Sequence, residues 1–436
     1  MDEWITDPKT IEKSKKYYAH FDCRTDIVKT KKLITDPVWV AHHGFYPFIH
    51  YKKDCTKYSK KNGKNPKKRD ICYAAHIDRC IFQYYCHLMN EHYIEMIKSL
   101  GIEDVPVAYR TDLGLNNIHL SKMAFDFIKK NPLSYIIIGD FTSFFDKLDH
   151  KYLKRQWCKL LGEEQLPPDH YNIFKNITSY SQWELDDLLD LNDLQRTGAG
   201  RKKLNSQYTV LTREQYVNNR FQIHKHAEPY GIPQGSPLSA LLANIYMLDV
   251  DQQIKTIADQ YSGKYMRYSD DFIIILPVNE ETAKSLIHTI TTIIVDTPGL
   301  ELEPKKTQIY KAELPSIKNV GEYFLDNSDK TKHVINFLGF TFDGVNITLR
   351  QKTVSKYYYR MYRKARAVAV NPGQKGKDHL YDRYSERGAK PSKDKRGNFF
   401  TYVYRADNTF GKTETIKEPV KNHMAKIRKA LKKGKK

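Results

Sequence analysis

The chain has 436 residues and a formal net charge of +21 at pH 7, and this length suffices for two or three domains with hydrophobic cores. No apolar run approaches the roughly 18 residues of a membrane helix, and the acidic N-terminus is no signal peptide. We therefore expect a cytoplasmic protein without membrane contact. The charge is concentrated in residues 51–80 (net +7) and 351–436 (net +18). Such segments attract polyphosphates, which favours a nucleic-acid partner, although a ribosome-associated protein would carry similar charge.

Six cysteines are present without a C-x-x-C pair. The spacing of Cys80, Cys86 and His87 fits no common zinc module. We therefore expect reduced thiols, as in cytosolic proteins.

Residues 1–50 are expected to be mixed in structure and partly irregular. Residues 42–47 are interpreted as a packed aromatic cluster and the Lys-rich residues 51–70 as a loop, followed by a short strand at 71–73. Apolar residues recur at helical spacing between 77 and 100. A second helix is expected at 116–130, ended by Asn131-Pro132.

The middle of the chain begins with a continuous apolar run at 134–139, which predicts a buried strand that ends at Asp140. Residues 151–180 are expected to be helical. The acidic residues 181–195 are interpreted as a solvated helix face or an insertion, and residues 198–203 as a loop. A turn-rich loop at 229–235 precedes a helix at 237–258.

Two adjacent carboxylates, Asp270 and Asp271, lie between runs rich in β-branched and aromatic residues. Strands are expected at 265–268 and 272–276, with the acidic pair at the hairpin tip. Carboxylates this close repel, and one stays protonated unless a cation neutralises the pair. Asp is also a common turn former, so the pair alone does not decide between a plain turn and a metal site.

The last third of the chain is expected to contain a helix at 280–297 and strands at 334–342 and 345–349. A hairpin turn at Asp343-Gly344 joins the two strands. The remainder is basic and helical in patches.

Asp140 and the acidic pair would converge if their strands belong to one sheet. Phosphoryl transfer from a nucleoside triphosphate to a 3′-hydroxyl uses two Mg²⁺ ions about 3.5–4 Å apart. Such hard cations prefer oxygen ligands. Acidic residues from two distant segments are what this chemistry requires, and the sequence offers such a set.

Five segments, in order, resemble the palm motifs of reverse transcriptases, especially those of group II introns and retrons. They are IGDFTSFFDKLDH at 138–150, YGIPQGSPLSALLAN at 230–244, RYSDDF at 267–272, LEPKKT at 302–307 and NFLGF at 336–340. The resemblance covers about residues 60–345. It implies an α+β right-hand polymerase fold, with an N-terminal region and fingers at 1–130 and a palm with an antiparallel sheet at 131–349. Part of the fingers is inserted around 160–228, and a basic helical thumb and tail follow at 350–436.

The same resemblance implies roles for individual residues. Asp140, Asp270 and Asp271 would be catalytic and hold two Mg²⁺ ions, with Mn²⁺ as a substitute and the Phe141 carbonyl as an extra ligand. The dNTP would contact Lys68, Arg69, Phe145, Gln234 and Lys306. Nucleic acid would contact Arg267, Lys356, Arg360, Arg363 and Lys364.

Phe145 occupies the position where a ring would leave no room for a 2′-hydroxyl, which selects deoxynucleotides. RNA-directed RNA polymerases place an acid in this region to accept that hydroxyl, and Asp146 lies one residue away. The first reading implies an RNA-directed DNA polymerase and the second an RNA-directed RNA polymerase.

We expect a compact, stand-alone enzyme without an RNase H domain or endonuclease module, and no maturase domain is recognisable, so the chain most resembles the bacterial "unknown group" reverse transcriptases. That subgroup implies antiphage defence, a structured non-coding RNA as template, dNTPs as substrates and a DNA product. Retron-type enzymes are one alternative, and abortive-infection enzymes, which can make DNA without a template from a protein primer, are a second. An inactive palm that acts as an RNA-binding scaffold is another. The chain is also a candidate homo-oligomer.

Overall fold

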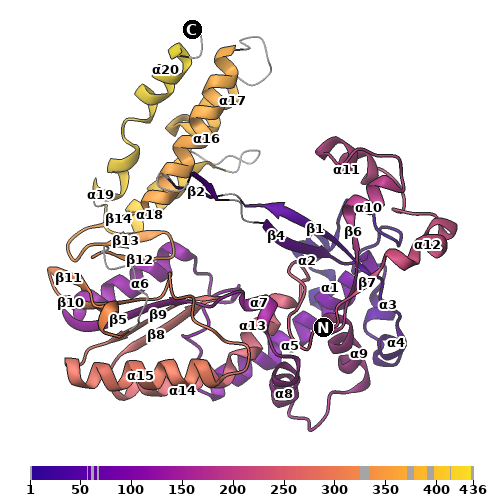
Figure 1. The fold of residues 1–436 in the computed structure, drawn as a ribbon, viewed down its shortest axis with the longest axis horizontal. Coiled ribbons are helices and arrows are strands. Elements are labelled where there is room, and N and C mark those ends of the chain that lie inside the picture. The colour runs from indigo at the N-terminus through magenta and orange to yellow at the C-terminus, as the bar shows by residue number, and fades with distance from the viewer. Residues whose placement is uncertain are drawn as a thin grey trace. The chain divides into compact units, whose positions relative to one another are not determined.

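The computed structural model describes residues 2–55, 57–59, 63–65, 68–324, 333–370, 378–389, 397–412 and 414–433. The chain forms two compact units, each assembled from three stretches of sequence (Figure 1). The first unit contains residues 1–109, 141–254 and 292–302, and the second contains 110–140, 255–291 and 303–436. Helices and strands occur in both, which confirms the predicted α+β class. In the described ranges, no helix combines the length and apolarity needed to cross a bilayer.

The first unit has a four-stranded sheet in the order β4-β1-β6-β7. Strand β1 (Phe48–Asp54) pairs antiparallel with β4 (Lys68–Tyr73) and parallel with β6 (Ser181–Glu184), and β7 (His224–Lys225) completes the edge. The loop predicted from residue 51 is therefore wrong at both ends, because 52–54 pair with 68–70. Their side chains are exposed, so the strand continues through backbone hydrogen bonds without an apolar signal. A short hairpin, β2 (Lys57–Ser59) and β3 (Gly63–Asn65), lies between them.

Most of the first unit is helical, and the long helix predicted at 77–100 is confirmed as α5 (His76–Ser99). The helix predicted at 151–180 is two helices, because Gly162 ends the first in the left-handed conformation. The other helices are α1 (Asp2–Thr6), α2 (Pro8–Ser14), α3 (Lys31–Ile34), α4 (Pro37–His42), α7 (Phe144–Lys147), α8 (His150–Leu161), α9 (Pro168–Thr178), α10 (Leu185–Asp190), α11 (Gly198–Leu204), α12 (Arg213–Asn219) and α13 (Ser239–Tyr246).

Two interpretations of the segment 181–204 change with the structure. The acidic residues 181–195 form β6 and α10, and α10 buries Leu185, Leu188 and Leu189 beneath its acidic face. The loop predicted at 198–203 is helix α11, because the Thr197 hydroxyl caps its first turn by accepting a hydrogen bond from the N–H of Gly200.

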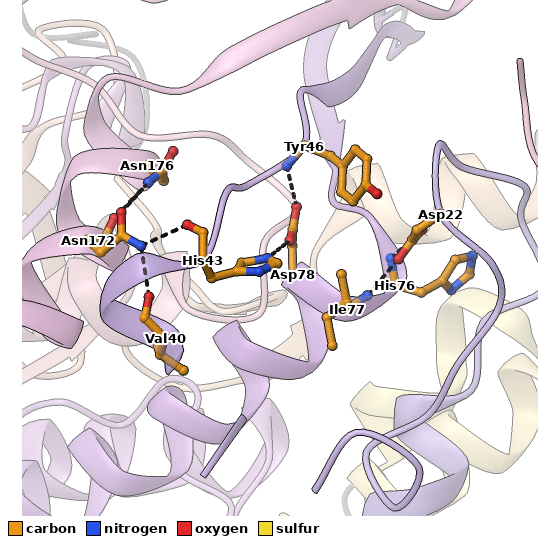
Figure 2. Close-up of polar contacts among 9 residues, drawn as sticks. All are labelled: Asp22, Val40, His43, Tyr46, His76, Ile77, Asp78, Asn172 and Asn176. Carbon is orange, nitrogen blue, oxygen red and sulfur yellow. Dashed lines mark hydrogen bonds and ion pairs between the residues drawn. The ribbon is translucent and has the colours of Figure 1, made fainter. Parts of the chain in front are cut away.

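Buried polar contacts fix the N-terminal segment to the start of α5, as Figure 2 shows. The Asp22 carboxylate accepts hydrogen bonds from the first backbone N–H groups of α5. The buried Asp78 carboxylate lies 2.7 Å from Nε2 of His43 and accepts a 2.9 Å hydrogen bond from the N–H of Tyr46. Burial raises the pKa of Asp78 to about 6. His43 also stacks on Trp39, which confirms that residues 42–47 belong to an aromatic cluster.

The second unit is built on a five-stranded sheet in the order β11-β10-β5-β9-β8, drawn as one layer in Figure 1. The central strand β5 (Leu133–Asp140) pairs antiparallel with β9 (Asp271–Leu276) on one side and β10 (Gln308–Glu313) on the other. Strands β8 (Lys264–Tyr268) and β11 (Ser316–Asn319) form the edges. The predicted strand at 134–139 and the predicted hairpin around Asp270 are both confirmed.

A second sheet and most helices of this unit come from its C-terminal part. The strand predicted at 334–342 is two strands, because positive φ angles at Leu338 and Gly339 form a turn inside it. The three strands are β12 (Ile335–Phe337), β13 (Phe340–Phe342) and β14 (Ile347–Leu349). The helices are α6 (Asn117–Lys130), α15 (Glu280–Asp296), α16 (Gln351–Val370), α17 (Asp378–Tyr384), α18 (Phe399–Thr409), α19 (Glu414–Lys417) and α20 (His423–Lys433), and α14 (Leu248–Gln260) joins the two units in sequence.

Candidate active site

Three carboxylates meet at one end of the sheet in the second unit. Asp140 is the last residue of β5 and lies opposite Asp271, the first residue of β9. Ser269 and Asp270 form the two-residue turn that joins β8 to β9, and Asp270 comes directly before Asp271. The other turn residue, Ser269, has a φ of 61°, as the first central position of a type II′ hairpin turn requires. We call Asp140, Asp270 and Asp271 the carboxylate edge.

The backbone around Asp140 is held by the segment that follows α15. The Asp140 carbonyl accepts a 2.8 Å hydrogen bond from the N–H of Glu303. Lys306, one turn further on, makes an ion pair with the Asp140 carboxylate. Asp140 itself is only 8% exposed, so this ammonium group is the nearest compensation for a nearly buried charge.

Burial and mutual repulsion make the carboxylate edge hard to ionise fully. Burial, followed by the charge of Asp140, raises the pKa of Asp270. Burial of the Asp271 carboxyl, together with Asp270 and Asp140, raises the pKa of Asp271 to about 7. The residue surface of Asp271 is nevertheless exposed, so solvent screens part of the repulsion. The edge carries more negative charge than Lys306 alone compensates.

The donor set fits a hard divalent cation. Among the described residues, no three His, Cys, Asp or Glu side chains lie close enough in this conformation to hold a metal ion. Carboxylate oxygens in excess of neighbouring positive charge are nevertheless the ligands that Mg²⁺ prefers. Burial and, after it, repulsion among the carboxylates raise the pKa of Asp270 and Asp271, and a bound cation would offset both effects. Asp140, Asp270 and Asp271 are therefore the residues that would hold it.

A second cluster of candidate residues lies in the first unit. The Gln234 amide donates a 3.1 Å hydrogen bond to the carboxylate of Asp146. The N–H of Ile232 donates to the carbonyl of Phe145 at 2.9 Å. The loop predicted at 229–235 is therefore tied to the segment that carries the candidate sugar-discriminating ring, and Phe145 is half-buried.

Six of the predicted phosphate and nucleic-acid contacts lie on β4 and α16. Lys68 and Arg69 are exposed at the start of β4. On α16, Lys356, Arg360 and Arg363 are exposed. Lys364 is half-buried on the same helix.

The opposite face of α16 is part of the core. Tyr357 is buried and its hydroxyl donates a 2.7 Å hydrogen bond to the carbonyl of Tyr384. Met361 and Ala365 pack against residues of α17 and α20. Tyr359, in contrast, is 65% exposed.

Arg267 differs from the expectation that it contacts nucleic acid. Its side chain is 0% exposed, and Nη1 donates a 3.2 Å hydrogen bond to the carbonyl of Ser269. A buried guanidinium that binds the turn backbone cannot reach a phosphate in this conformation. Arg267 is better described as a positioning residue for the turn that carries Asp270.

A comparison with models of protein families matches residues 60–342 to the family described as reverse transcriptase (RNA-dependent DNA polymerase). The chain belongs to the reverse transcriptase family. A comparison with curated proteins found no match.

Solved structures that are similar to this reverse transcriptase include telomerases from two Candida species. Apo telomerase from Candida tropicalis truncated from its C-terminal domain is 14% identical with a TM-score of 0.43, covering 75% of this chain and 61% of that one. Apo telomerase from Candida tropicalis is 13% identical with a TM-score of 0.41, covering 96% of this chain and 73% of that one. Telomerase from Candida albicans in complex with a telomeric RNA fragment is 13% identical with a TM-score of 0.40, covering 94% and 65%. The reverse transcriptase thus spans less than two thirds of the first of these proteins.

Sequence reasoning missed two positions that shape the carboxylate edge. Gly139 pairs with Phe272, and a Cβ at Gly139 would lie 2.1 Å from Cζ of that ring. An isolated glycine inside a strand is a signal for such a close approach. The left-handed backbone of Ser269 has no comparable signal, because serine rarely adopts it.

Proposed function

We propose that this reverse transcriptase makes complementary DNA at the carboxylate edge, on a structured non-coding RNA template. The opposition of Asp140 and Asp271 across β5 and β9, with Asp270 in the adjoining turn, is the observation that carries the proposal. In the reaction, the 3′-hydroxyl oxygen of the primer forms a bond to the α-phosphorus while the bond to pyrophosphate breaks. Two Mg²⁺ ions held by the carboxylate edge, with Mn²⁺ as a substitute, would lower the pKa of the hydroxyl and neutralise the triphosphate.

The chain's own residues supply binding and selection in this proposal. Lys68 and Arg69 bind the triphosphate, since a guanidinium makes bidentate contacts to phosphate oxygens. Lys306 neutralises charge on the departing pyrophosphate. The basic face of α16, made of Lys356, Arg360, Arg363 and Lys364, contacts the phosphates of the duplex, and the Phe141 carbonyl adds a metal ligand.

The Phe145 ring is the group that favours DNA synthesis over RNA synthesis in this proposal, because a ring beside the sugar leaves no room for a 2′-hydroxyl. An RNA polymerase would instead use an acid near this position to accept the 2′-hydroxyl. The Asp146 carboxylate accepts the Gln234 amide at one oxygen and has a second oxygen for such a contact, so the choice between the two rests on the experiment. We expect Phe145→Ala to raise the rate of rNTP incorporation relative to dNTP incorporation.

Primer extension on a primed RNA template with Mg²⁺ tests this function. We expect dNTP incorporation by the wild type and a loss of about 10²–10³-fold or more in Asp270→Asn, since that change removes charge at the reacting centre. Asp259→Asn is the matched control, because Asp259 is exposed and pairs only at the surface with Lys255. A preference for rNTPs would support the RNA polymerase instead, and synthesis without template would support the protein-primed enzyme. No Mg²⁺-dependent synthesis would support the RNA-binding scaffold.

We also propose a role in antiphage defence within the bacterial cytoplasm, supported by the resemblance to the stand-alone defence enzymes. Wild-type protein should lower phage plating efficiency and Asp270→Asn should not. Sequencing the nucleic acid that copurifies with the protein would identify template and product together. Equal plating with both proteins would contradict the defence role without affecting the polymerase assignment.

A further inference from the structure

The turn between β12 and β13, in the second unit, holds two successive residues in the left-handed backbone conformation. Leu338 has a φ of 43° and Gly339 a φ of 95°. Glycine adopts this conformation readily, but for leucine it costs free energy, and such a conformation persists only where neighbouring groups enforce it. The turn therefore depends on the contacts around it.

One asparagine side chain supplies the main contact. Asn117, the first residue of α6, donates a 2.9 Å hydrogen bond from Nδ2 to the carbonyl of Leu338. The same amino group donates at 2.9 Å to the hydroxyl of Tyr402 on α18. Because a carbonyl can only accept, the orientation of the amide is fixed and both of its N–H donors are used. Ser121 of α6 also donates, at 3.2 Å, to the carbonyl of Phe337. The turn is thus tied to both α6 and α18.

The turn also holds the start of α16. The Gly339 carbonyl accepts a 2.9 Å hydrogen bond from the N–H of Arg350, the residue immediately before α16. The Arg350 carbonyl in turn accepts hydrogen bonds from the N–H groups of Thr353 and Val354, in the first turn of that helix. The backbone of the turn therefore sets where α16 begins.

Helices α18 and α6 connect this turn to the rest of the second unit (Figure 1). Phe399 of α18 stacks on the buried Tyr357 of α16 with ring centroids 4.7 Å apart, and Tyr402 stacks on Phe399 at 6.1 Å. At its other end, α6 is followed by β5, whose last residue is Asp140. The hydrogen bonds of Asn117 therefore link the element that leads to the carboxylate edge with the helix that carries the basic face.

We propose that Asn117 and Tyr402 are positioning residues that hold the basic face of α16 at a fixed place relative to the carboxylate edge. The inference rests on the proposed function, in which that face contacts the phosphates of the duplex. When the two hydrogen bonds of Asn117 are lost, the Leu338–Gly339 turn relaxes and α16 is no longer fixed. Phosphate contacts are then lost while the carboxylates keep their own geometry.

Fluorescence anisotropy of the full chain with a primer–RNA duplex measures the effect on binding. In Asn117→Ala, we expect the affinity to fall about ten-fold, as for the loss of one or two hydrogen bonds. The slope of log affinity against log salt should fall by about one or more, because phosphate contacts are lost. A partly unfolded protein would bind less duplex but would keep the slope. Single-turnover primer extension at saturating duplex should stay within about two-fold of the wild type, since the carboxylates are untouched.

A tyrosine pair on α18 separates the hydrogen bond from general packing. Tyr402→Phe keeps the ring and removes only the hydroxyl that accepts from Asn117, and we expect the affinity to fall about three-fold. Asn117→Ala/Tyr402→Phe should match Asn117→Ala within about two-fold, because the shared hydrogen bond is already gone. Tyr404→Phe is the matched control, since the Tyr404 hydroxyl contacts Glu386 on the surface, and it should bind as the wild type.

Arg360→Ala reports separately on the duplex contact and should lower the salt slope by about one. If it does so while Asn117→Ala keeps the wild-type affinity and slope, the positioning role is wrong and the duplex contact stands. Fully additive effects of Asn117→Ala and Tyr402→Phe would also overturn the role, because the two residues would then act independently. An unchanged slope in Arg360→Ala would refute the duplex contact itself, and with it the function assigned to the pair.

Discussion

Gly139→Ala tests how closely β5 and β9 must approach to form the carboxylate edge. Gly139 faces Phe272 across the strand pair, and a methyl group at Gly139 would lie 2.1–2.9 Å from three atoms of that ring. Phe272 is buried at 1% exposure, so the ring has no free space to enter. Either the ring or the strand must move.

The expected cost is that of overpacking a core, about 1–3 kcal/mol. For a domain of 150–250 residues this corresponds to a fall in Tm of about 2–4 °C per kcal/mol. Gly139 immediately precedes Asp140 and Phe272 immediately follows Asp271. A displacement of the carboxylates by about 1 Å would lower kcat by about 100-fold.

Thermal unfolding and single-turnover primer extension would measure both effects. Gly139→Ala/Phe272→Leu should recover part of the stability and rate, because the smaller side chain leaves room for the added methyl group. Gly198→Ala is the control, since a Cβ there meets nothing within 4 Å. Wild-type stability and rate in Gly139→Ala would refute the close-approach argument.

Three further predictions concern other buried groups. Because burial raises the pKa of Asp78 to about 6, deprotonation opposes folding, so wild-type stability should fall between pH 4 and 6. Asp78→Asn should gain up to ~3 kcal/mol relative to wild type across that window, measured by denaturant unfolding. Tyr357→Phe should lose about 1 kcal/mol in the same assay, and Tyr359→Phe nothing. Arg267→Gln should lower stability and kcat without changing the salt dependence of RNA binding, although it removes a positive charge.

Each of these has a clear contrary result. A stability difference between wild type and Asp78→Asn that is independent of pH would show that the carboxylate does not titrate in this range. Equal effects of the two tyrosine changes would contradict the buried position of Tyr357. A decrease of about one in the salt slope for Arg267→Gln would return that residue to the phosphate contacts.

The sequence allowed three of the five strands in the second unit's main sheet, β5, β8 and β9, to be predicted, because apolar and aromatic runs border the acidic residues. The run 134–139 and the hairpin around Asp270 each carry an unambiguous signal, and the structure contains both. The pairing of β5 with β9 was inferred from chemistry, because strand partners far apart in sequence leave no local pattern.

Other features could not be found this way. Residues 52–54 and 68–70 are strands whose side chains are solvated, so composition resembles a loop. Helix α11 begins with Gly198-Ala199-Gly200, which has poor helix propensity. The buried position of Arg267 depends on packing around a turn, and charge alone suggests the surface. A cavity of about 320 Å³ in the first unit is lined by residues from six separated segments, and no single stretch of sequence indicates it.

The order of strands in the second unit also constrains when activity can arise during synthesis. β5 lies between β9 and β10, which follow it by more than a hundred residues, so none of its ladder hydrogen bonds can form until those residues have been made. Contacts this distant in sequence form slowly, because a long loop must close before pairing is rewarded. A nascent chain that ends before residue 271 contains Asp140 at the end of β5 but lacks β9, the strand that brings Asp271 opposite it. We expect such a chain to fold its first helices without any capacity for nucleotidyl transfer.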